Sequence, residues 1–493
     1  MRDEGSSRLE HEHRDISPNV FRHQAQQAVD WIVEYLENMN QYPVLARSKP
    51  GELKAKIPES PPTKPDPFEN IMDDFQKIIL PGITHWNHPR FFAYFSVSSS
   101  YPGIIGEMLC SALNVNAMLW RTSPSATELE EVATDWLRQM LGLPEQFDGV
   151  INDTASVSSL CAIAAAREHA GLHIREEGLA GRNLPQLRIY TSEEAHSSIE
   201  KAAIVLGIGQ NGVRKIPTDQ AFRMDTQVLE NVLKEDVENG VKPICIIPTI
   251  GTTSTTSIDP VKEISELCMK YGIWLHVDAA YGGSAAAVRE MRPLFAGWEN
   301  ADSIVVNPHK WLFTPLDCSI LYCRQPEVLK QAFSLTPEYL RTAEASDVKN
   351  LMDYGVSLGR RFRALKLWMI LRAFGSEGIA NIIQEHISYA KRLEKMVRAS
   401  PDFELLAPVP FSTLVMRFCP KTPAYNEAES NSINEKLMEA INQTGQVFLS
   451  HTKLRGKYGI RLTIGNIKTT WKDVSLAWEI IQQKAKELST NNY

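Results

Sequence analysis

The sequence has few cysteines for its 493 residues, and none of them form a close pair. The seven cysteines are an odd number and are scattered along the chain without a CxxC motif. Because a disulfide framework or a zinc site needs paired or clustered cysteines, we expect reduced thiols and no metal site. Reduced, mostly buried thiols are typical of a cytoplasmic protein.

Long apolar runs and an excess of positive charge are also missing. The first residues, MRDEGSSRLEHEHRD, are charged where a secretory signal would be apolar, and no stretch is long enough to span a bilayer. Lys and Arg number 52 against 59 Asp and Glu, a net charge of −7. Nucleic-acid binding and polybasic membrane binding both need basic surfaces, so we expect neither partner.

What the sequence does contain is a large apolar fraction in an alternating pattern. Apolar residues make up 43% of the chain, enough for a sizeable core. Between about residues 125 and 325, the strand-like runs LRIYTS, PICIIPTIG, IWLHVD and DSIVVN alternate with the helix-like stretches EEAHSSIEKAAIVLG, DTQVLENVLKEDVEN and DPVKEISELCMKYG. This alternation predicts an α/β fold with a mainly parallel sheet, covered by helices and binding ligands at the carboxyl ends of its strands.

The two ends of the chain have a different character. Residues 1–100 predict a helical arm with one apolar stripe (Phe21, Ala25, Ala28, Ile32 and Leu36), followed by a proline-rich extended linker. The stripe is too narrow to form a core alone, and we expect it to pack on a second copy of the chain. Residues 101–375 would form the large α/β domain, and residues 376–493 a smaller α+β domain.

One glycine pattern imitates a dinucleotide-binding motif. Gly207, Gly209 and Gly212 spell GxGxxG, which must follow a strand and open a helix in order to bind a nicotinamide cofactor. Here the glycines follow a predicted helix and precede the strand-like VRKI. We therefore expect them to end a helix and form a turn.

The strongest chemical signal is HVDAAYGGS followed by NPHKW. Asp278 closes one predicted strand, and Lys310 lies just after the next, so both side chains can point into one crevice. An acid and a lysine in this arrangement suit pyridoxal phosphate: a lysine amine forms a Schiff base with its aldehyde, and a carboxylate keeps its ring nitrogen protonated. Taken singly, Asp278 could cap a turn and Lys310 could be an exposed loop lysine.

At this point the chain resembles the group II pyridoxal-phosphate-dependent decarboxylases, and most closely the aromatic L-amino acid decarboxylases. The resemblance runs along nearly the whole chain, from PGITHWNHPRFFAYF through TSPSATELE, HVDAAYGGSA, NPHKW and LGRRFRALKLW. It implies a fold-type I, aminotransferase-like large domain. It also implies a homodimer with the active site at the interface, in which the N-terminal arm wraps the partner.

The resemblance assigns the residues around the cofactor ring. Lys310 would be the Schiff-base lysine and Asp278 the partner of the pyridine nitrogen. Ala280 would pack on one face of the ring, and His196 would stack on the other. The alternative for His196 is a histidine at a helix start that binds nothing.

The cofactor phosphate needs a helix N-terminus, and NDTASVSSLCAIAAAR supplies small polar residues that open a helical run. Ala155 and Ser156 would donate to the phosphate there, with Asn307 and His309 nearby. Thr253 resembles the family's threonine close to the cofactor. Asp153 and Thr154 would cap the same helix under either interpretation.

The implied reaction is decarboxylation of an aromatic L-amino acid of the tryptophan, tyrosine, dopa or phenylalanine type to the arylalkylamine and CO₂. In the family a loop tyrosine protonates the α-carbon, and TPEYL places Tyr339 at that position. The alternative is an aromatic aldehyde synthase, which consumes oxygen and releases aldehyde, ammonia and hydrogen peroxide; Tyr339 argues against it. A decarboxylase of acidic amino acids or a non-enzymatic dimeric scaffold is less compatible with these motifs.

Several residues resemble the family's aromatic substrate pocket, part of which is shared across the dimer. Aromatic side chains there favour an aromatic substrate by stacking. Val97 lacks the hydroxyl that could bond a catechol, which disfavours dopa, and Gly359 leaves room for a large ring. The expected pocket residues are Trp86, Tyr94, Phe95, Val97, Met118, Trp120 and Gly359.

Overall fold

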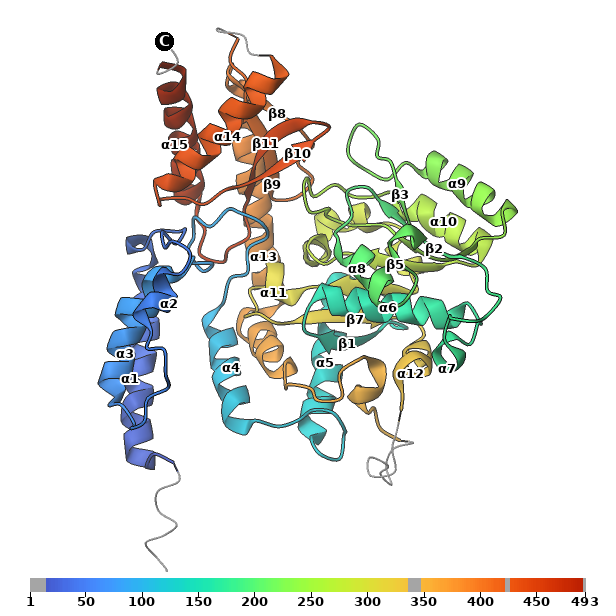
Figure 1. Cartoon of the computed structure of the whole chain (residues 1–493), viewed down its shortest axis with the longest axis horizontal. Helices are drawn as coiled ribbons and strands as arrows, with labels where there is room; N and C mark the ends of the chain where they lie inside the picture. The colour runs from blue at the N-terminus through green and yellow to red at the C-terminus, as the bar shows by residue number, and fades with distance from the viewer. Residues whose placement is uncertain (1–14, 336–346, 422–425, 491–493) are drawn as a thin grey trace, which may run out of the picture.

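Two β-sheets organise the chain in the computed structural model, which describes residues 15–335, 347–421 and 426–490 (Figure 1). The larger sheet has the strand order β1-β7-β6-β5-β4-β2-β3. Strands β3, β2, β4, β5 and β6 run parallel, whereas β7 is antiparallel to both of its neighbours. The predicted mainly parallel sheet is therefore confirmed. Its strands are β1 (Asp148–Asn152), β2 (Leu187–Ser192), β3 (Val213–Ile216), β4 (Lys242–Ile247), β5 (Trp274–Asp278), β6 (Ser303–Val306) and β7 (Ser319–Cys323).

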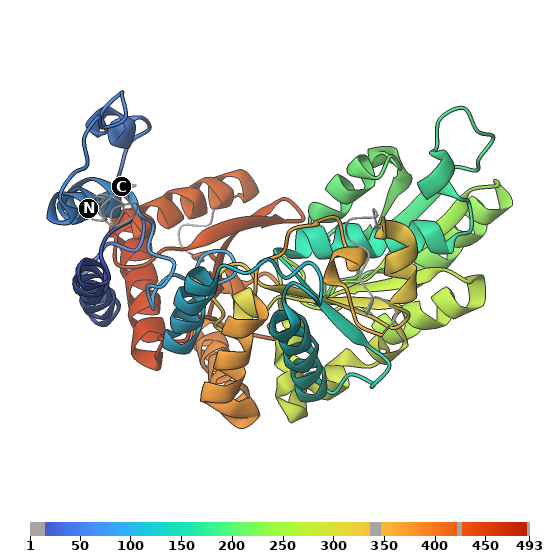
Figure 2. The ribbon, with the colours of Figure 1, turned by 90° about the horizontal axis from the view of Figure 1, so that it is seen from below.

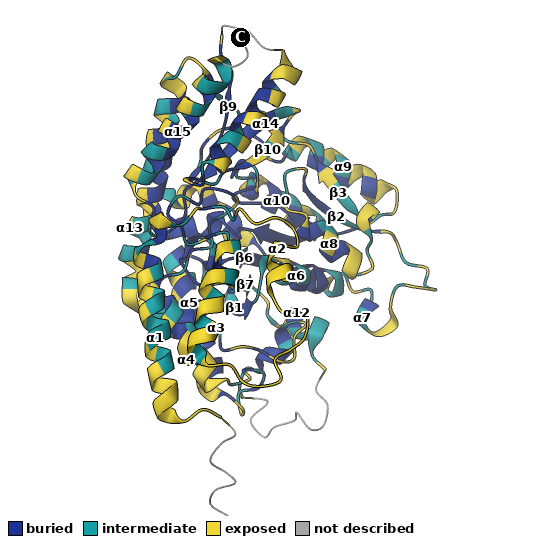
Figure 3. Cartoon of the chain, turned by 60° about the vertical axis from the view of Figure 1, so that its left-hand side comes forward, coloured by how far each residue is buried: buried dark blue, intermediate teal, exposed yellow. Residues whose placement is uncertain are grey.

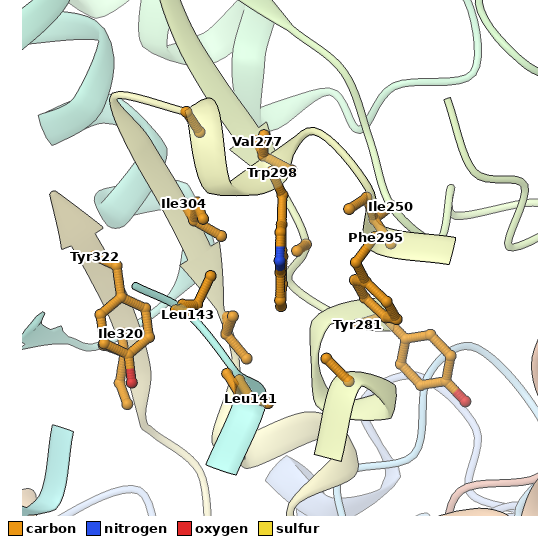
Figure 4. Close-up of a cluster of buried hydrophobic side chains, with 14 of the residues drawn as sticks. Leu141, Leu143, Ile250, Val277, Tyr281, Phe295, Trp298, Ile304, Ile320 and Tyr322 are labelled. Atoms are coloured by element: carbon orange, nitrogen blue, oxygen red, sulfur yellow. The ribbon is translucent and has the colours of Figure 1, made fainter. Parts of the chain in front are cut away.

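Helices cover both faces of this sheet because successive strand residues point to opposite sides. Ile189 packs in a core with α6 and α8, while the next residue, Tyr190, packs in a core with α5, α9 and α10. Figure 4 shows part of the second core, where the Trp298 ring stands between Ile304 and Phe295. The helices are α5 (Pro124–Leu141), α6 (Ala155–His169), α7 (Ile174–Glu177), α8 (Ser198–Val205), α9 (Thr226–Glu238), α10 (Val261–Tyr271), α11 (Pro308–Trp311) and α12 (Glu327–Phe333).

The segment after β2 corrects one predicted boundary. EEAHSS was expected to be helical, but α8 begins only at Ser198. Ser192 explains the delay, since its carbonyl accepts the N–H of Ala195 and its hydroxyl accepts the N–H of Glu194 at 3.0 Å, which makes a turn. At the other end of α8, Gly207 and Gly209 have positive φ (77° and 78°) and lead through a 3₁₀ turn into β3. The glycine pattern thus ends a helix, as predicted.

The second sheet is antiparallel, with the order β10-β11-β9-β8. It has its own apolar core with three long helices. The first helix, α13, is interrupted at Gly375, where φ is 66°. The exact boundary at residue 375 between the two domains stays a prediction. The elements are β8 (Phe403–Leu405), β9 (Thr413–Phe418), β10 (Ser450–Leu454), β11 (Lys457–Thr463), α13 (Ala364–Ala399), α14 (Glu427–Gln443) and α15 (Trp471–Thr490).

The N-terminal helices stand apart at one end of the molecule (Figures 1 and 2). Of the predicted apolar stripe only Leu36 is buried, and Phe21 is 62% exposed. The neighbouring helix α4 exposes five further apolar side chains (Figure 3): Tyr101, Ile105, Met108, Leu109 and Leu113. These elements are α1 (Pro18–Glu37), α2 (Glu52–Lys56), α3 (Phe68–Asp74) and α4 (Tyr101–Leu113). Across the described residues, none of the helices has the length and apolar character needed to cross a membrane.

Candidate active site

A cavity of about 510 Å³ lies where the carboxyl ends of the parallel strands meet the second sheet. Most of the site residues predicted from the sequence converge on it, although they come from six separate stretches of the chain. The predicted residues that line it are Trp86, Tyr94, Phe95, Val97, Ala155, Ser156, His196, Thr253, Asp278, Ala280, Asn307, His309 and Lys310.

Asp278 and Lys310 enter the cavity from adjacent strands. Asp278 is the last residue of β5 and pairs in register with Val305 of β6, and Lys310 lies in the short helix α11 that follows β6. The N–H of Ala280 donates to Asp278 Oδ1 at 3.1 Å and fixes the carboxylate. Burial lowers the pKa of Lys310 below its usual 10.5, and the nearby Asp278 opposes this shift. The lowered pKa increases the neutral, nucleophilic fraction of the amine.

His196 lies in the turn before α8, with its protonation pattern fixed by Ser198. Its Nδ1 accepts the backbone N–H of Ser198 at 3.2 Å and lies 2.9 Å from the Ser198 hydroxyl oxygen. Since a backbone N–H can only donate, Nδ1 is unprotonated and the neutral ring carries its proton on Nε2. Burial lowers the pKa of His196, which Asp278 opposes and Lys310 and Lys201 assist. His196 is therefore a neutral donor at neutral pH.

The N-terminus of α6 opens into the same cavity. The first N–H groups of a helix, here those of Ala155 and Ser156, have no partner within the helix and suit an anion such as phosphate. Two cavity-lining oxygens, Asn307 Oδ1 and Thr249 Oγ1, are buried and have no hydrogen-bond partner among the described residues. Buried polar atoms of this kind are rare and offer hydrogen-bonding capacity to a bound ligand or water. Together with the amine and the carboxylate, this donor set fits pyridoxal phosphate.

His309 is held in one tautomer as well. Its Nδ1 accepts the N–H of Cys318 at 3.0 Å, so Nε2 carries the proton. Burial lowers the pKa of His309 to about 3. It contributes an uncharged N–H donor to the cavity wall.

Aromatic rings form another part of the wall. Phe95 stacks on Tyr281 with centroids 3.9 Å apart, and Tyr281 stacks on Trp311 at 4.7 Å. The Lys310 Nζ lies 5.2 Å from the centroid of Phe95. At the rim, Trp86 and Tyr94 stack at 6.0 Å and remain 40% and 55% exposed. The cavity can therefore accept an aromatic ring by stacking and apolar burial.

The sequence analysis missed the wall contributed by the hairpin of β10 and β11. Arg461 is buried and lines the cavity together with Ser450, His451 and Thr452. Arg461 Nε donates to the carbonyl of Ser254 at 3.2 Å and Nη1 to that of Tyr94, whereas Nη2 has no partner among the described residues. Burial lowers the pKa of Arg461 to about 10, so it stays charged at neutral pH. An arginine inside the apolar strand YGIRLTIG was the available signal.

Three predicted pocket residues do not line this cavity. Met118, Trp120 and Gly359 lie on two segments that bond to each other, for example through the N–H of Ala117 and the carbonyl of Arg360 at 2.9 Å. Their role in a pocket shared across a dimer stays a prediction. Tyr339 lies outside the described residues. No group of three or more potential metal ligands occurs in the parts of the chain that the structure describes.

Comparison with known proteins adds independent information. Residues 50–418 match the pyridoxal-dependent decarboxylase conserved domain. Tyrosine decarboxylase 4 of Petroselinum crispum is 40% identical over 96% of this chain and 94% of its own length, and phenylacetaldehyde synthase of a Rosa hybrid cultivar is 39% identical over 96% and 95%. The crystal structure of Oryza sativa TDC with PLP and tryptamine superposes with a TM-score of 0.93 at 35% identity, covering 96% of this chain and 99% of that one. The predicted fold class and family resemblance are confirmed.

Proposed function

The chain belongs to the pyridoxal-dependent decarboxylases, which are carbon–carbon lyases, and we propose that it converts an aromatic L-amino acid to the arylalkylamine and CO₂. One observation carries the proposal: an amine, a carboxylate, a helix N-terminus and an aromatic wall converge on a single cavity. The names of the relatives, which include tyrosine decarboxylase, support an aromatic substrate.

Different cavity residues would hold different parts of pyridoxal phosphate. When bound, this cofactor withdraws electrons from the bond that joins the substrate α-carbon to its carboxyl group. Lys310 would bind the aldehyde carbon, and Asp278 would hold a proton on the ring nitrogen. Ala280 and His196 would contact the two ring faces. The cavity residues that would lie near the phosphate are Ala155, Ser156, Asn307, His309 and Thr253.

The second sheet supplies the group for the amino acid itself. Arg461 is charged and buried, and its Nη2 has no hydrogen-bond partner in the part of the chain that the structure describes, so we propose that it binds the substrate carboxylate. Its guanidinium carbon lies 4.7 Å from the Phe95 centroid, which places the carboxylate beside the aromatic wall. Trp86, Tyr94 and Phe95 would then receive the substrate ring. Val97 offers no hydroxyl to a catechol, so dopa would not be preferred.

A direct test of cofactor attachment uses the purified chain loaded with pyridoxal phosphate. The loaded protein should be yellow, and borohydride should bleach the colour and fix the cofactor on the peptide that contains Lys310. Peptide mass spectrometry would locate the added mass. Reduction that leaves Lys310 unmodified, or labels another lysine, would contradict the assignment.

Aldehyde synthesis is the second candidate function, since one relative at 39% identity is a phenylacetaldehyde synthase. We propose that Tyr339 protonates the α-carbon and thereby directs the reaction to amine. Tyr339→Phe should divert product from amine to aldehyde, with release of hydrogen peroxide. An unchanged amine yield from this variant would remove Tyr339 from the mechanism.

We also propose that the enzyme is a homodimer with a composite active site. The exposed apolar faces of α1 and α4 provide a contact surface, and the Met118–Trp120 and Gly359 segments would face the cavity of the partner. The seven free thiols support a reducing, cytoplasmic location.

Mixed dimers test the composite site. Lys310→Ala and Gly359→Trp should each inactivate the homodimer. Unfolding and refolding the two variants together should restore part of the activity, because one site of the mixed dimer combines an intact Lys310 with an intact Gly359 segment from the other chain. Recovery of no activity, from dimers shown to have mixed, would exclude sharing of these segments.

A further inference from the structure

The small sheet meets the large domain at a contact away from the cavity. Phe222 lies in the turn between β3 and α9, and its backbone takes a left-handed conformation with φ of 60°. Phe222 is only 4% exposed, because it packs among Ala407, Val415 and Leu454 of the second sheet and its connections. A side chain of the large domain is thus inserted into the small one.

Arg455 completes this contact from the tip of the β10–β11 hairpin, which extends toward the large sheet in Figure 1. Its guanidinium carbon lies 4.7 Å from the centroid of Phe222. Nη1 donates to Gln220 Oε1 at 2.7 Å, and Nη2 donates to the carbonyl of Asp219. The Asp219 carboxylate in turn accepts the N–H groups of Ala221 and Arg223. These bonds fix the conformation of the receiving turn, residues 219–223, against which Arg455 packs.

The same hairpin carries the small-domain wall of the cavity. Thr452 Oγ1 donates to Ser254 Oγ at 3.0 Å, and Arg461 Nε donates to the Ser254 carbonyl at 3.2 Å. The loop that contains Ser254 is also tied to the receiving turn, since Ser257 Oγ donates to the carbonyl of Ala221 at 2.7 Å. The hairpin tip therefore contacts the receiving turn, the receiving turn contacts the loop that contains Ser254, and this loop contacts the hairpin.

We propose that Phe222 and Arg455 act as an interdomain latch, a pair of positioning residues that holds Arg461 and Thr452 against the substrate site. The proposal rests on the proposed function of Arg461 as the carboxylate-binding residue. The groups that would hold the cofactor, Lys310 and Asp278 among them, all belong to the large domain. The latch therefore sets the affinity for the amino acid and leaves cofactor affinity unchanged.

The test compares Arg455→Ala with Lys453→Ala in the full-length, cofactor-loaded enzyme. Lys453 is an exposed cation on the same hairpin and serves as the matched control. Loss of an exposed cation–π contact and its accompanying hydrogen bonds predicts a KM for the amino acid raised about five-fold in Arg455→Ala, with kcat nearly unchanged. Arg455→Lys should recover part of the KM, and Lys453→Ala should match the wild type.

Two further measurements separate positioning from loss of stability. Titration with pyridoxal phosphate should give the same affinity for Arg455→Ala as for the wild type. Hydrogen–deuterium exchange should speed up in residues 450–461 and stay unchanged in β5 and β6. Phe222→Leu, which keeps an apolar side chain but removes the ring under the guanidinium, should give the same pattern.

An unchanged KM together with unchanged exchange in 450–461 would overturn the latch. So would an equal loss of substrate and cofactor affinity, which indicates general destabilisation. If the wild type decarboxylates no amino acid, the proposed function fails. The exchange experiment would still show whether the latch holds the hairpin.

Discussion

The two walls of the cavity differ in how their residues are distributed along the chain. The large-domain wall takes Asp278 and Lys310 from short motifs at the ends of consecutive parallel strands, with His196 from the turn after another strand. The small-domain wall takes Arg461 from an antiparallel hairpin that is remote in sequence. Parallel strands concentrate chemistry at one edge, where local motifs reveal it. A hairpin that reaches the site through tertiary contacts has no such motif. Its only signal in the sequence is a charged residue, Arg461, within an otherwise apolar strand.

The comparison also separates expected roles: the large-domain wall should control the chemical step, and the small-domain wall the binding of the amino acid. The largest effect should follow from Lys310→Ala, which removes the amine that we propose to bind the cofactor. We expect turnover to fall about 10³-fold or more. Steady-state assays with excess cofactor measure this, and a circular dichroism spectrum like that of the wild type would show that the fold is intact. Substantial residual activity would contradict the assignment of Lys310 to the chemical step.

Asp278→Asn should have the next largest effect. Asparagine keeps the shape and can still accept the N–H of Ala280, but it carries no charge to hold a proton on the cofactor ring. We expect kcat to fall about 10²-fold or more, in line with the loss of a positioned proton-holding group. Asp278→Ala should in addition bind little cofactor. Full activity of either variant would contradict the role of this carboxylate.

Arg461→Lys tests whether the small-domain wall binds the amino acid and not the cofactor. Lysine keeps the charge but loses the planar fork that can grip a carboxylate. We expect KM for the amino acid to rise about tenfold or more, the cost of a charge-assisted hydrogen bond, with the cofactor still bound. The amine product lacks a carboxylate, so its inhibition constant should change little. Equal weakening of amino acid and amine would show that Arg461 only supports the fold.

The smallest effect concerns stability, which depends on two buried histidines behind the cavity, His276 in β5 and His386 in α13. Burial lowers the pKa of His276 and of His386 to about 4, below their usual 6.5. Between these values the unfolded chain binds protons that the folded chain does not, so stability falls as pH drops from 6.5 toward 4. Each histidine should cost about 1.4 kcal/mol per pH unit in that range and nothing above it.

His386→Gln provides the control, since glutamine can still accept the Trp311 indole N–H that His386 Nδ1 accepts at 3.0 Å. The difference between the thermal midpoints at pH 7 and pH 5.5 should be smaller in this variant than in the wild type. The same pH dependence in both proteins would mean that the pKa of His386 does not differ between the folded and the unfolded chain, which would contradict the lowered pKa.

Much of the fold followed from local sequence pattern. LRIYTS coincides with β2, and IWLHVD contains β5, because buried parallel strands are short and rich in branched residues. The edge strand β1 and its antiparallel neighbour β7 were not anticipated. The start of α8 was placed too early, since side-chain bonding to Ser192 decides it. In the site, the position of Arg461 depends on packing between distant segments. The proposed role of Met118, Trp120 and Gly359 would depend on a second chain.

The enzyme should convert an aromatic amino acid to its amine at this cavity. The most direct measurement supplies the cofactor-loaded enzyme separately with tryptophan, 5-hydroxytryptophan, tyrosine, dopa, phenylalanine and glutamate. Mass spectrometry would follow amine and aldehyde, and a peroxide dye would follow hydrogen peroxide. We predict amine from at least one aromatic substrate, no product from glutamate and no stoichiometric peroxide. Aldehyde formed with equal peroxide, or turnover of glutamate alone, would contradict decarboxylation of an aromatic amino acid to its amine.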